Sequence, residues 1–202
     1  MNAVHYIVPA KDIIIQSANL KQTDTMGSKI SSDYKVKILL CGAPNTGKNQ
    51  LFKSLRTNKP TKEVVLANSM NVQLAPRYVT LDEDLVVNLN IWNIEEKHID
   101  SPIKSTYLQG GSGAIFIFSF SDRESWQSIK TWYDLVQQFS PNIPFILLGN
   151  GNAEGSQITS DECEFWAKER GGMLMQSDID ANTEGNNGFS RVLLNLANMI
   201  VK

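Results

Sequence analysis

The sequence predicts an α/β fold in which an open, mostly parallel sheet is covered by helices on both faces. Short apolar runs typical of buried strands alternate along the chain with segments of helical periodicity. The first run, Lys35–Cys41, leads directly into a glycine-rich turn. Two further β-rich runs, Val72–Leu81 and Leu85–Trp92, are separated by only three acidic residues, which predicts an antiparallel hairpin. Ligands of such sheets bind beyond the C-terminal ends of the strands.

The remaining elements follow in order. A helix is expected over Asn49–Leu55, after the glycine-rich turn, and Ala114–Phe120 predicts a fully apolar strand. The pattern Ser121-Asp122-Arg123-Glu124 is a capping box that opens a helix. The apolar face of that helix is expected to pack in the core and consists of Trp126, Ile129, Trp132, Tyr133 and Val136. The C-terminal part is expected to hold a strand, a second capping box with its helix, a short strand and a closing amphipathic helix: Phe145–Leu148, Thr159–Glu162, Met173–Met175 and Phe189–Val201.

Composition favours one ordinary globular domain. Of 202 residues, 42% are hydrophobic and 20% charged, and the net charge of -2 gives no reason to expect nucleic acid as a partner. The two cysteines, Cys41 and Cys163, stand in no zinc or redox spacing, so buried free thiols are expected. No stretch reaches the roughly twenty apolar residues that a membrane span needs.

The two ends of the chain carry separate expectations. Residues 1–33 are interpreted as an N-terminal extension or linker, and residues 34–202 as the folded domain. The apolar run Ile13–Ile15 raises the alternative that the extension docks onto the domain. The C-terminus lacks a cysteine for prenylation, so no direct lipid anchor is expected. These features favour a cytoplasmic protein, which a partner would have to recruit to a membrane.

The glycine-rich turn matches a phosphate-binding loop. Residues 42–49 read Gly-Ala-Pro-Asn-Thr-Gly-Lys-Asn and fit the pattern G-x-x-x-x-G-K between a strand and a helix. Backbone N–H groups and the helix N-terminus would then face the phosphates, and Lys48 would reach the β- and γ-phosphates. The predicted binding residues here are Asn45, Thr46, Gly47, Lys48 and Asn49. The interpretation that competes with this one is a loop kept only as a scaffold turn.

The last position of this loop departs from the pattern. A Ser or Thr hydroxyl normally coordinates magnesium there, whereas this chain has Asn49. An amide oxygen can bind a hard cation, but the longer side chain misplaces it for octahedral geometry. Asn49 is therefore expected to weaken magnesium binding.

Several blocks resemble the Rab proteins of the Ras superfamily of small GTPases. Together with the phosphate loop and Leu89–Trp92, these blocks are Tyr107–Ala114, Asp122–Trp126 and Pro141–Asn150. The resemblance covers roughly Tyr34 to the end of the chain. It implies a P-loop NTPase-type fold with a six-stranded sheet and about five helices.

The resemblance also identifies positions at which the family handles the γ-phosphate. A loose alignment places Ser69 at the threonine that binds magnesium. The stretch that follows Trp92 in the family, Asp-Thr-Ala-Gly-Gln-Glu, is replaced by residues 93–98 of this chain, Asn-Ile-Glu-Glu-Lys-His. Asn93 thus lacks the carboxylate that helps to hold magnesium, and Glu96 brings negative charge where a glycine N–H meets the γ-phosphate. Lys97 stands at the catalytic glutamine and cannot accept a hydrogen bond from the attacking water.

Base recognition is altered as well. The family pattern Asn-Lys-x-Asp becomes Asn150-Gly151-Asn152-Ala153, so the resemblance implies a binding role only for Asn150. The lysine that stacks on the base and the aspartate that pairs with guanine are missing. Glu154 would replace that aspartate only after a slip of the loop by one residue. The family's Ser-Ala-Lys aligns with residues 178–180, Asp-Ile-Asp.

The leading hypothesis is therefore a Rab-like pseudo-GTPase that binds effector or regulator proteins through its switch-equivalent surface. The resemblance points to vesicle traffic or signalling. The alternative is an atypical switch that binds GTP or GDP weakly, discriminates bases poorly and hydrolyses GTP slowly or not at all. A P-loop kinase or ATPase of another class is disfavoured, because no second catalytic constellation occurs in the sequence. Partner identity and oligomeric state stay open.

Overall fold

The computed structural model describes residues 33–55, 63–66, 70–81, 85–156, 158–179 and 187–202. Apart from Asp33, the predicted N-terminal extension, including Ile13–Ile15, lies outside these residues, and the domain boundary stays a prediction. The described elements are, in order, β1 (Tyr34–Gly42), α1 (Lys48–Ser54), β2 (Glu63–Leu66), β3 (Met70–Thr80), β4 (Val86–Asn93), η1 (Glu96–His98), α2 (Lys104–Leu108), β5 (Gly113–Ser119), α3 (Arg123–Phe139), β6 (Phe145–Asn150), α4 (Ser160–Lys168), β7 (Met173–Ser177) and α5 (Asn187–Val201).

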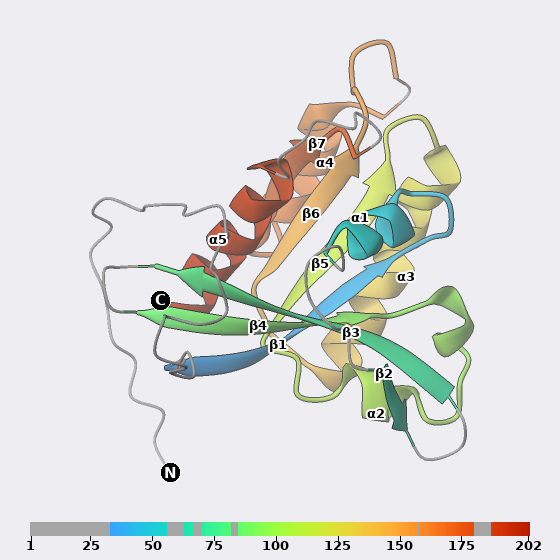
Figure 1. The fold of residues 1–202 in the computed structure, drawn as a ribbon. Helices are drawn as coiled ribbons and strands as arrows, with labels where there is room; N and C mark the ends of the chain where they lie inside the picture. Colours follow the sequence, from blue (N-terminus) through green and yellow to red (C-terminus); the bar gives the residue numbers. More distant parts are fainter. Residues whose placement is uncertain (1–32, 56–62, 67–69, 82–84, 157, 180–186) are drawn as a thin grey trace.

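The strands form a single sheet with the order β2-β3-β4-β1-β5-β6-β7 (Figure 1). Strand β1 lies at its centre and pairs in parallel with β4 and β5, and the parallel pairing continues through β6 to β7. Strand β3 pairs with β4 in antiparallel register, which confirms the predicted hairpin. The predicted α/β fold, with its mostly parallel sheet and five α-helices, is confirmed in the described part of the chain.

The sheet contains one strand more than the six that the resemblance implies. The six expected strands are present, and the short strand β2 is added at the edge through antiparallel pairing of Glu63–Leu66 with β3. Strand β3 also begins at Met70, two residues before the expected start. A four-residue segment is too short to show a clear period of two. Its pairing depends on the partner strand, and the periodicity of the segment itself carries no information about that partner.

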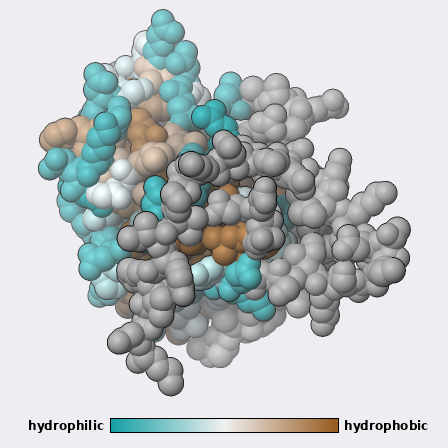
Figure 2. All heavy atoms as spheres, turned by 90° about the vertical axis from the view of Figure 1, so that its left-hand side faces the viewer, coloured by the Kyte–Doolittle hydropathy of each residue, from teal (hydrophilic) through white to brown (hydrophobic). Residues whose placement is uncertain are grey.

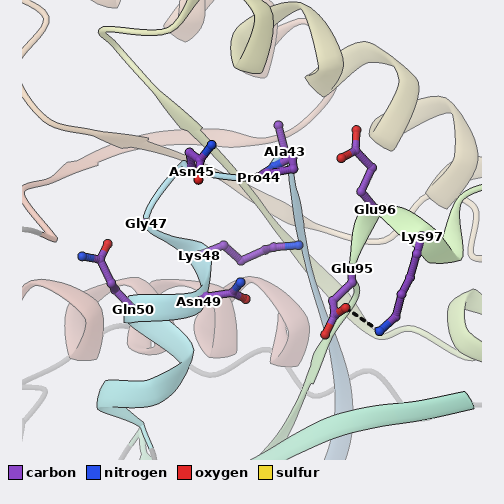
Figure 3. Close-up of a pocket in the computed structure, with 10 residues that line it drawn as sticks. All are labelled: Ala43, Pro44, Asn45, Gly47, Lys48, Asn49, Gln50, Glu95, Glu96 and Lys97. Carbon is purple, nitrogen blue, oxygen red and sulfur yellow. Dashed lines mark ion pairs between the residues drawn. The ribbon is translucent and has the colours of Figure 1, made fainter.

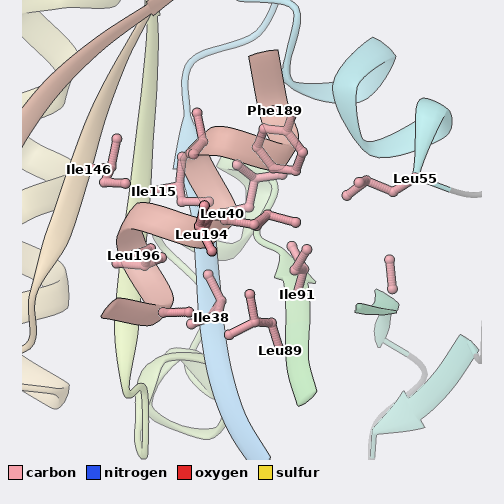
Figure 4. Close-up of a cluster of buried hydrophobic side chains, with 14 of the residues drawn as sticks. Ile38, Leu40, Leu55, Leu89, Ile91, Ile115, Ile146, Phe189, Leu194 and Leu196 are labelled. Atoms are coloured by element: carbon pink, nitrogen blue, oxygen red, sulfur yellow. The ribbon is translucent and has the colours of Figure 1, made fainter. Parts of the chain in front are cut away.

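Two hydrophobic clusters cover the two faces of the sheet. Alternation along β1 divides its side chains, so that Ile38 and Leu40 join the cluster packed against α1 and α5 (Figure 4). Leu39 and Cys41 point to the other face and join the cluster with α2, α3 and α4. Because both faces are covered, the central strands consist of nearly continuous apolar runs.

The predicted apolar face of α3 is confirmed as core, but the predicted start of this helix is wrong by one residue. Asp122 is the N-cap, and its carboxylate accepts hydrogen bonds from the backbone N–H groups of Glu124 (3.0 Å) and Ser125 (3.2 Å). The Ser121 hydroxyl instead lies 2.8 Å from that of Ser119. A carboxylate is as good an N-cap as a serine, so the serine is free to bond within the preceding turn.

The second capping box is half formed. Thr159 caps α4 by accepting a hydrogen bond from Glu162 N at 3.2 Å. The Glu162 carboxylate does not turn back to the cap. It accepts hydrogen bonds from Trp126 Nε1 at 2.9 Å and from the Arg123 guanidinium at 3.1 Å. This side chain therefore ties α4 to α3.

Both cysteines are buried free thiols, as predicted. Burial raises the pKa of Cys41 to about 12, so this thiol is protonated at neutral pH and is no nucleophile.

Figure 2 shows one face of the molecule, on which hydrophilic residues dominate the described surface and a hydrophobic patch lies near the centre. Among the described helices, none combines the length and apolar character required to cross a membrane.

Candidate functional site

The glycine-rich loop joins β1 to α1 at the C-terminal edge of the parallel strands. Gly47 caps α1 in the left-handed region with φ 84°, and a Cβ at this position would lie 2.7 Å from Asn150 Nδ2. Asn45 is also left-handed, with φ 60°, a conformation that asparagine adopts more readily than most residues. The buried Thr46 hydroxyl donates to Ala43 O at 2.9 Å. The loop is thus folded as the wrapped turn that the phosphate-loop pattern predicts.

A pocket of about 590 Å³ lies over this loop (Figure 3). One wall consists of the loop and the first turn of α1, and the opposite wall is the segment that follows β4. The lining residues are Ala43, Pro44, Asn45, Gly47, Lys48, Asn49, Gln50, Glu95, Glu96 and Lys97. Four of the predicted phosphate-binding residues therefore line the pocket. The fifth, Thr46, is fully buried and supports the loop from beneath.

The Lys48 ammonium is engaged within the protein. Its Nζ donates to Ile94 O at 2.6 Å and lies 5.7 Å from the centroid of the Trp132 ring. The residue is 5% exposed, and desolvation lowers the pKa of its ammonium. In Figure 3 the side chain extends from α1 toward the segment that carries Glu95 and Glu96. Contact with a phosphate in the pocket would require the ammonium to exchange or share its bond with Ile94 O.

Charge in the lining is balanced. The two lysines, Lys48 and Lys97, are offset by Glu95 and Glu96, so their formal charges sum to zero. Lys97 Nζ lies 2.7 Å from Glu95 Oε2 in an ion pair. Glu96 is exposed and begins η1. A phosphate group entering the pocket would therefore meet a carboxylate on the wall opposite the loop.

A group of amides occupies the positions that the family resemblance assigns to magnesium. Asn93, at the end of β4, is 2% exposed. Its Nδ2 donates to Asn49 Oδ1 at 3.3 Å and lies 3.5 Å from Oε1 of Gln73, its cross-strand neighbour on β3. The Asn93 Oδ1 atom is buried and has no hydrogen-bond partner in the structure. Within the described residues, no cluster of three or more His, Cys, Asp or Glu side chains could hold a metal ion.

Asn150, at the end of β6, links the loop to the segment after β7. Its Nδ2 donates to Thr46 O at 3.2 Å, and its Oδ1 accepts from Ile179 N at 2.9 Å. The next residue, Gly151, is left-handed with φ 86°, and Ala153 packs against the edge of the core. None of residues 150–154 lines the pocket. The pocket therefore covers the loop side of the site and stops short of the segment aligned with base recognition.

This arrangement of strand, loop, helix and β6 terminus is matched by comparison with known protein families. Residues 37–152 match the model of the Ras of Complex, or Roc, domain of DAPkinase. The match covers more than half of the chain and extends from β1 through the loop to Asn150 and the two residues after it. The chain belongs to the Roc/Ras-type small GTPases.

Similar proteins place this small GTPase among the Rab-like members, which confirms the predicted resemblance. The Ras-related protein RABA1c of Arabidopsis thaliana is 26% identical over 84% of this chain and 79% of its own length. The GTP-binding protein ypt2 of Schizosaccharomyces pombe is 25% identical over 79% of this chain and 80% of its own length. The Ras-related protein RIC2 of Oryza sativa is 24% identical over 84% of this chain.

Sequence reasoning found some participants in this small GTPase site and missed others. Asn49 and Asn93 were singled out separately, but nothing in the sequence indicated that they contact each other or that Gln73 joins them. Gln73 could have been predicted only from the register of β3 with β4, in which it pairs with Asn93. Ile179 was interpreted only as part of a lost motif, whereas its N–H is held by Asn150. Ser69 and Asp180 lie outside the described residues.

Proposed function

We propose that this small GTPase-fold protein is a pseudo-GTPase that acts as a protein-binding module. The observation that carries the proposal is the segment that follows β6. Asn150 keeps both of its scaffold hydrogen bonds, while Gly151 and Ala153 supply no group that could stack on a base or pair with guanine. A guanine edge buried there without a partner would lose about 1–3 kcal/mol, and more when the missing partner is charged.

The donor set at the metal position supports the same function. Magnesium in such sites is held by carboxylates, hydroxyls and phosphate oxygens in near-octahedral geometry. Here the described donors are the neutral amides of Asn49 and Asn93, and the Asn49 oxygen already accepts a hydrogen bond. The residues present do not fit a magnesium ion. Lys97 at the position of the catalytic glutamine adds the expectation that GTP hydrolysis is absent or very slow.

A surface suited to protein binding lies beside this site. Four half-buried apolar side chains, Leu74, Trp92, Ile99 and Ile103, come from β3, β4 and the segment before α2, and we call them the switch-equivalent surface. The Lys37 ammonium lies 3.9 Å from the centroid of the Trp92 ring. Apolar groups with an aromatic centre and a polar rim are typical of protein interfaces. In this proposal the protein is cytoplasmic, an effector or regulator binds here, and that partner provides recruitment to endomembranes in vesicle traffic or signalling.

The second candidate is an atypical switch that binds GTP or GDP weakly. The observation in its favour is the pocket itself, because the loop keeps its wrapped form and Lys48 lies in the lining. This candidate predicts measurable phosphate-dependent binding with little preference between bases.

A fluorescence titration separates the two candidates. Purified, nucleotide-stripped protein is titrated with labelled GTP, GDP and ATP, each with and without magnesium. The pseudo-GTPase proposal predicts weak or absent binding with no guanine preference and no effect of magnesium. Tight, magnesium-dependent binding that is selective for guanine would overturn it, and weak binding without base preference would favour the second candidate.

A gain-of-function variant sharpens the titration. Ala153→Asp restores a carboxylate at the position that pairs with guanine in the family, and it should raise the affinity for GDP relative to ADP. Glu154→Ala is the matched control, because Glu154 is exposed and its backbone N–H bonds to the Asn152 side chain. If Glu154→Ala abolishes guanine preference in an otherwise unchanged chain, Glu154 reads the base and the proposal is wrong.

A further inference from the structure

Two adjacent residues at the end of β4 are hydrogen-bonded to the first two residues of α1. Ile94 O accepts the hydrogen bond of the Lys48 ammonium at 2.6 Å, and Asn93 Nδ2 donates to Asn49 Oδ1 at 3.3 Å. Gln73 Oε1 adds a third contact, 3.5 Å from Asn93 Nδ2. We call these five residues the clasp. They join three elements, α1, β3 and β4, at the place where the switch-equivalent segment 93–98 begins.

The amide side of the clasp carries no formal charge, and its Asn93 end is buried. Asn93 is 2% exposed, and its Oδ1 is buried without a partner. An unsatisfied buried carbonyl costs free energy, which a site for a divalent cation would recover by coordination. Coordination is opposed here because the Asn93 donor group, not its acceptor, faces Asn49. The link across this gap is therefore an amide hydrogen bond, whereas the family uses a metal ion.

The clasp residues alternate with the switch-equivalent surface along both strands. Gln73 pairs with Asn93 in the sheet register, and Leu74 pairs with Trp92 immediately beside them. Because successive side chains of a strand point to opposite faces, the clasp holds the back of the two strands whose front carries the surface. Any movement of the end of β4 away from α1 would have to break the clasp.

We propose that the clasp replaces the magnesium-nucleotide link of a switch and locks segment 93–98 and the switch-equivalent surface in one conformation, with no ligand required. A ligand shifts a conformational equilibrium only through contacts that differ between the two states. Here the contacts that a γ-phosphate and its metal ion supply in a switching GTPase are made by the chain itself. This inference rests on the proposed function, because it describes how a module without a nucleotide cycle presents its binding surface.

Hydrogen-exchange mass spectrometry of the full chain tests the lock directly. Ile94 N donates to Leu40 O at 3.0 Å, so the exchange of its amide reports whether the end of β4 stays in the sheet. In the wild-type protein, exchange over residues 93–98 should be the same without ligand and with a non-hydrolysable GTP analogue plus magnesium. Asn49→Ala removes the exposed acceptor with little loss of packing and should speed this exchange by about tenfold.

The matched control is Asn90→Ala. Asn90 is an amide on β4, three residues before Asn93, and it makes no side-chain hydrogen bond to the described part of the chain. This variant should leave exchange over residues 93–98 unchanged. Equal exchange in Asn49→Ala and Asn90→Ala would overturn the lock. Protection of residues 93–98 by magnesium and the analogue in wild-type protein would overturn it as well.

The reversion Asn49→Ser with Asn93→Asp supplies the hydroxyl and the carboxylate of a magnesium site and removes the amide pair. Exchange over residues 93–98 should then rise without ligand and fall again when magnesium and the analogue are added. Reversion without any effect on exchange would contradict the lock. The proposed function fails separately: guanine-selective binding in the titration above, with wild-type exchange unchanged by ligand, would remove the pseudo-GTPase and leave the lock standing.

Discussion

Asn150 offers the strongest single test of how the phosphate loop is supported. The side chain is 5% exposed and connects three segments: the loop, the end of β6 and the chain after β7. The substitution Asn150→Ala removes the donor to Thr46 O and the acceptor for Ile179 N together. It also removes the amide that packs against Gly47, where a Cβ would lie 2.7 Å from Asn150 Nδ2. The substitution therefore acts on the loop without replacing any residue that lines the pocket.

The magnitude follows from the two lost hydrogen bonds. Each intramolecular hydrogen bond contributes about 0.5–1.5 kcal/mol net, and a buried group left without a partner costs about 1–3 kcal/mol. For Asn150→Ala we expect a loss of about 2–4 kcal/mol in the free energy of unfolding. In a domain of this size, a loss of that extent lowers Tm by roughly 5–15 °C.

Denaturant and thermal unfolding of the ligand-free protein measure this loss, and Asn152→Ala is the matched control. Asn152 lies two residues away, is exposed and accepts one local hydrogen bond from Glu154 N. Its replacement should cost less than about 0.5 kcal/mol, the usual range of an exposed substitution. If Asn150→Ala costs no more than Asn152→Ala in ligand-free protein, Asn150 does not support the loop, and its retention would have to be explained by a ligand.

Two further substitutions test a charged contact between helices and the packing of β6. Hydrogen bonding from Trp126, and then from Arg123, holds the pKa of Glu162 below its usual value, so its contribution to stability is present above about pH 4.3 and is lost as pH falls through the folded pKa. Glu162→Gln should accordingly be less stable than wild type at pH 7, and the difference in urea unfolding should shrink as the pH falls below about 4.3; a pH-independent difference would refute this. Gly149→Ala would place a Cβ 2.3 Å from Phe120 Cε2 and should cost roughly 1–3 kcal/mol by overpacking, measured as a shift in the denaturation midpoint, and an unchanged midpoint would show that the ring can move.

The sheet was predictable because its central strands are buried on both faces. Runs such as Ala114–Phe120 contain no polar residue until their ends, and such runs fit few structures other than interior strands. Edge elements gave weaker signals. Strand β2 is four residues long and acquires its identity from pairing with β3, and α2 is a single five-residue turn without a side-chain cap. Tertiary contacts decide such segments, and local propensity does not.

The site likewise has a part that the sequence predicts and a part that it does not. The phosphate loop was predictable because its spacing is local: the glycines and Lys48 lie within the segment Gly42–Lys48, directly between the flanking strand and helix. The clasp was not, since Asn49, Gln73 and Asn93 are brought together only by the register of β3 with β4 and by the position of α1. The local sequence around an asparagine does not determine which other side-chain amide it contacts in the fold.

Three residues of the nucleotide motifs that this chain keeps make structural contacts within the fold itself. Gly47 is required because a Cβ would strike Asn150, Lys48 satisfies the carbonyl of Ile94, and Asn150 holds the loop to the chain after β7. The positions that differ from the family, such as Gly151 and Ala153, are those to which the resemblance assigns contacts with the nucleotide, its magnesium ion or the attacking water. Keeping the first set is therefore expected of a protein-binding scaffold as much as of a working switch. The positions that changed therefore distinguish a protein-binding scaffold from a working switch, and a match to the G-x-x-x-x-G-K pattern alone is no measure of nucleotide affinity.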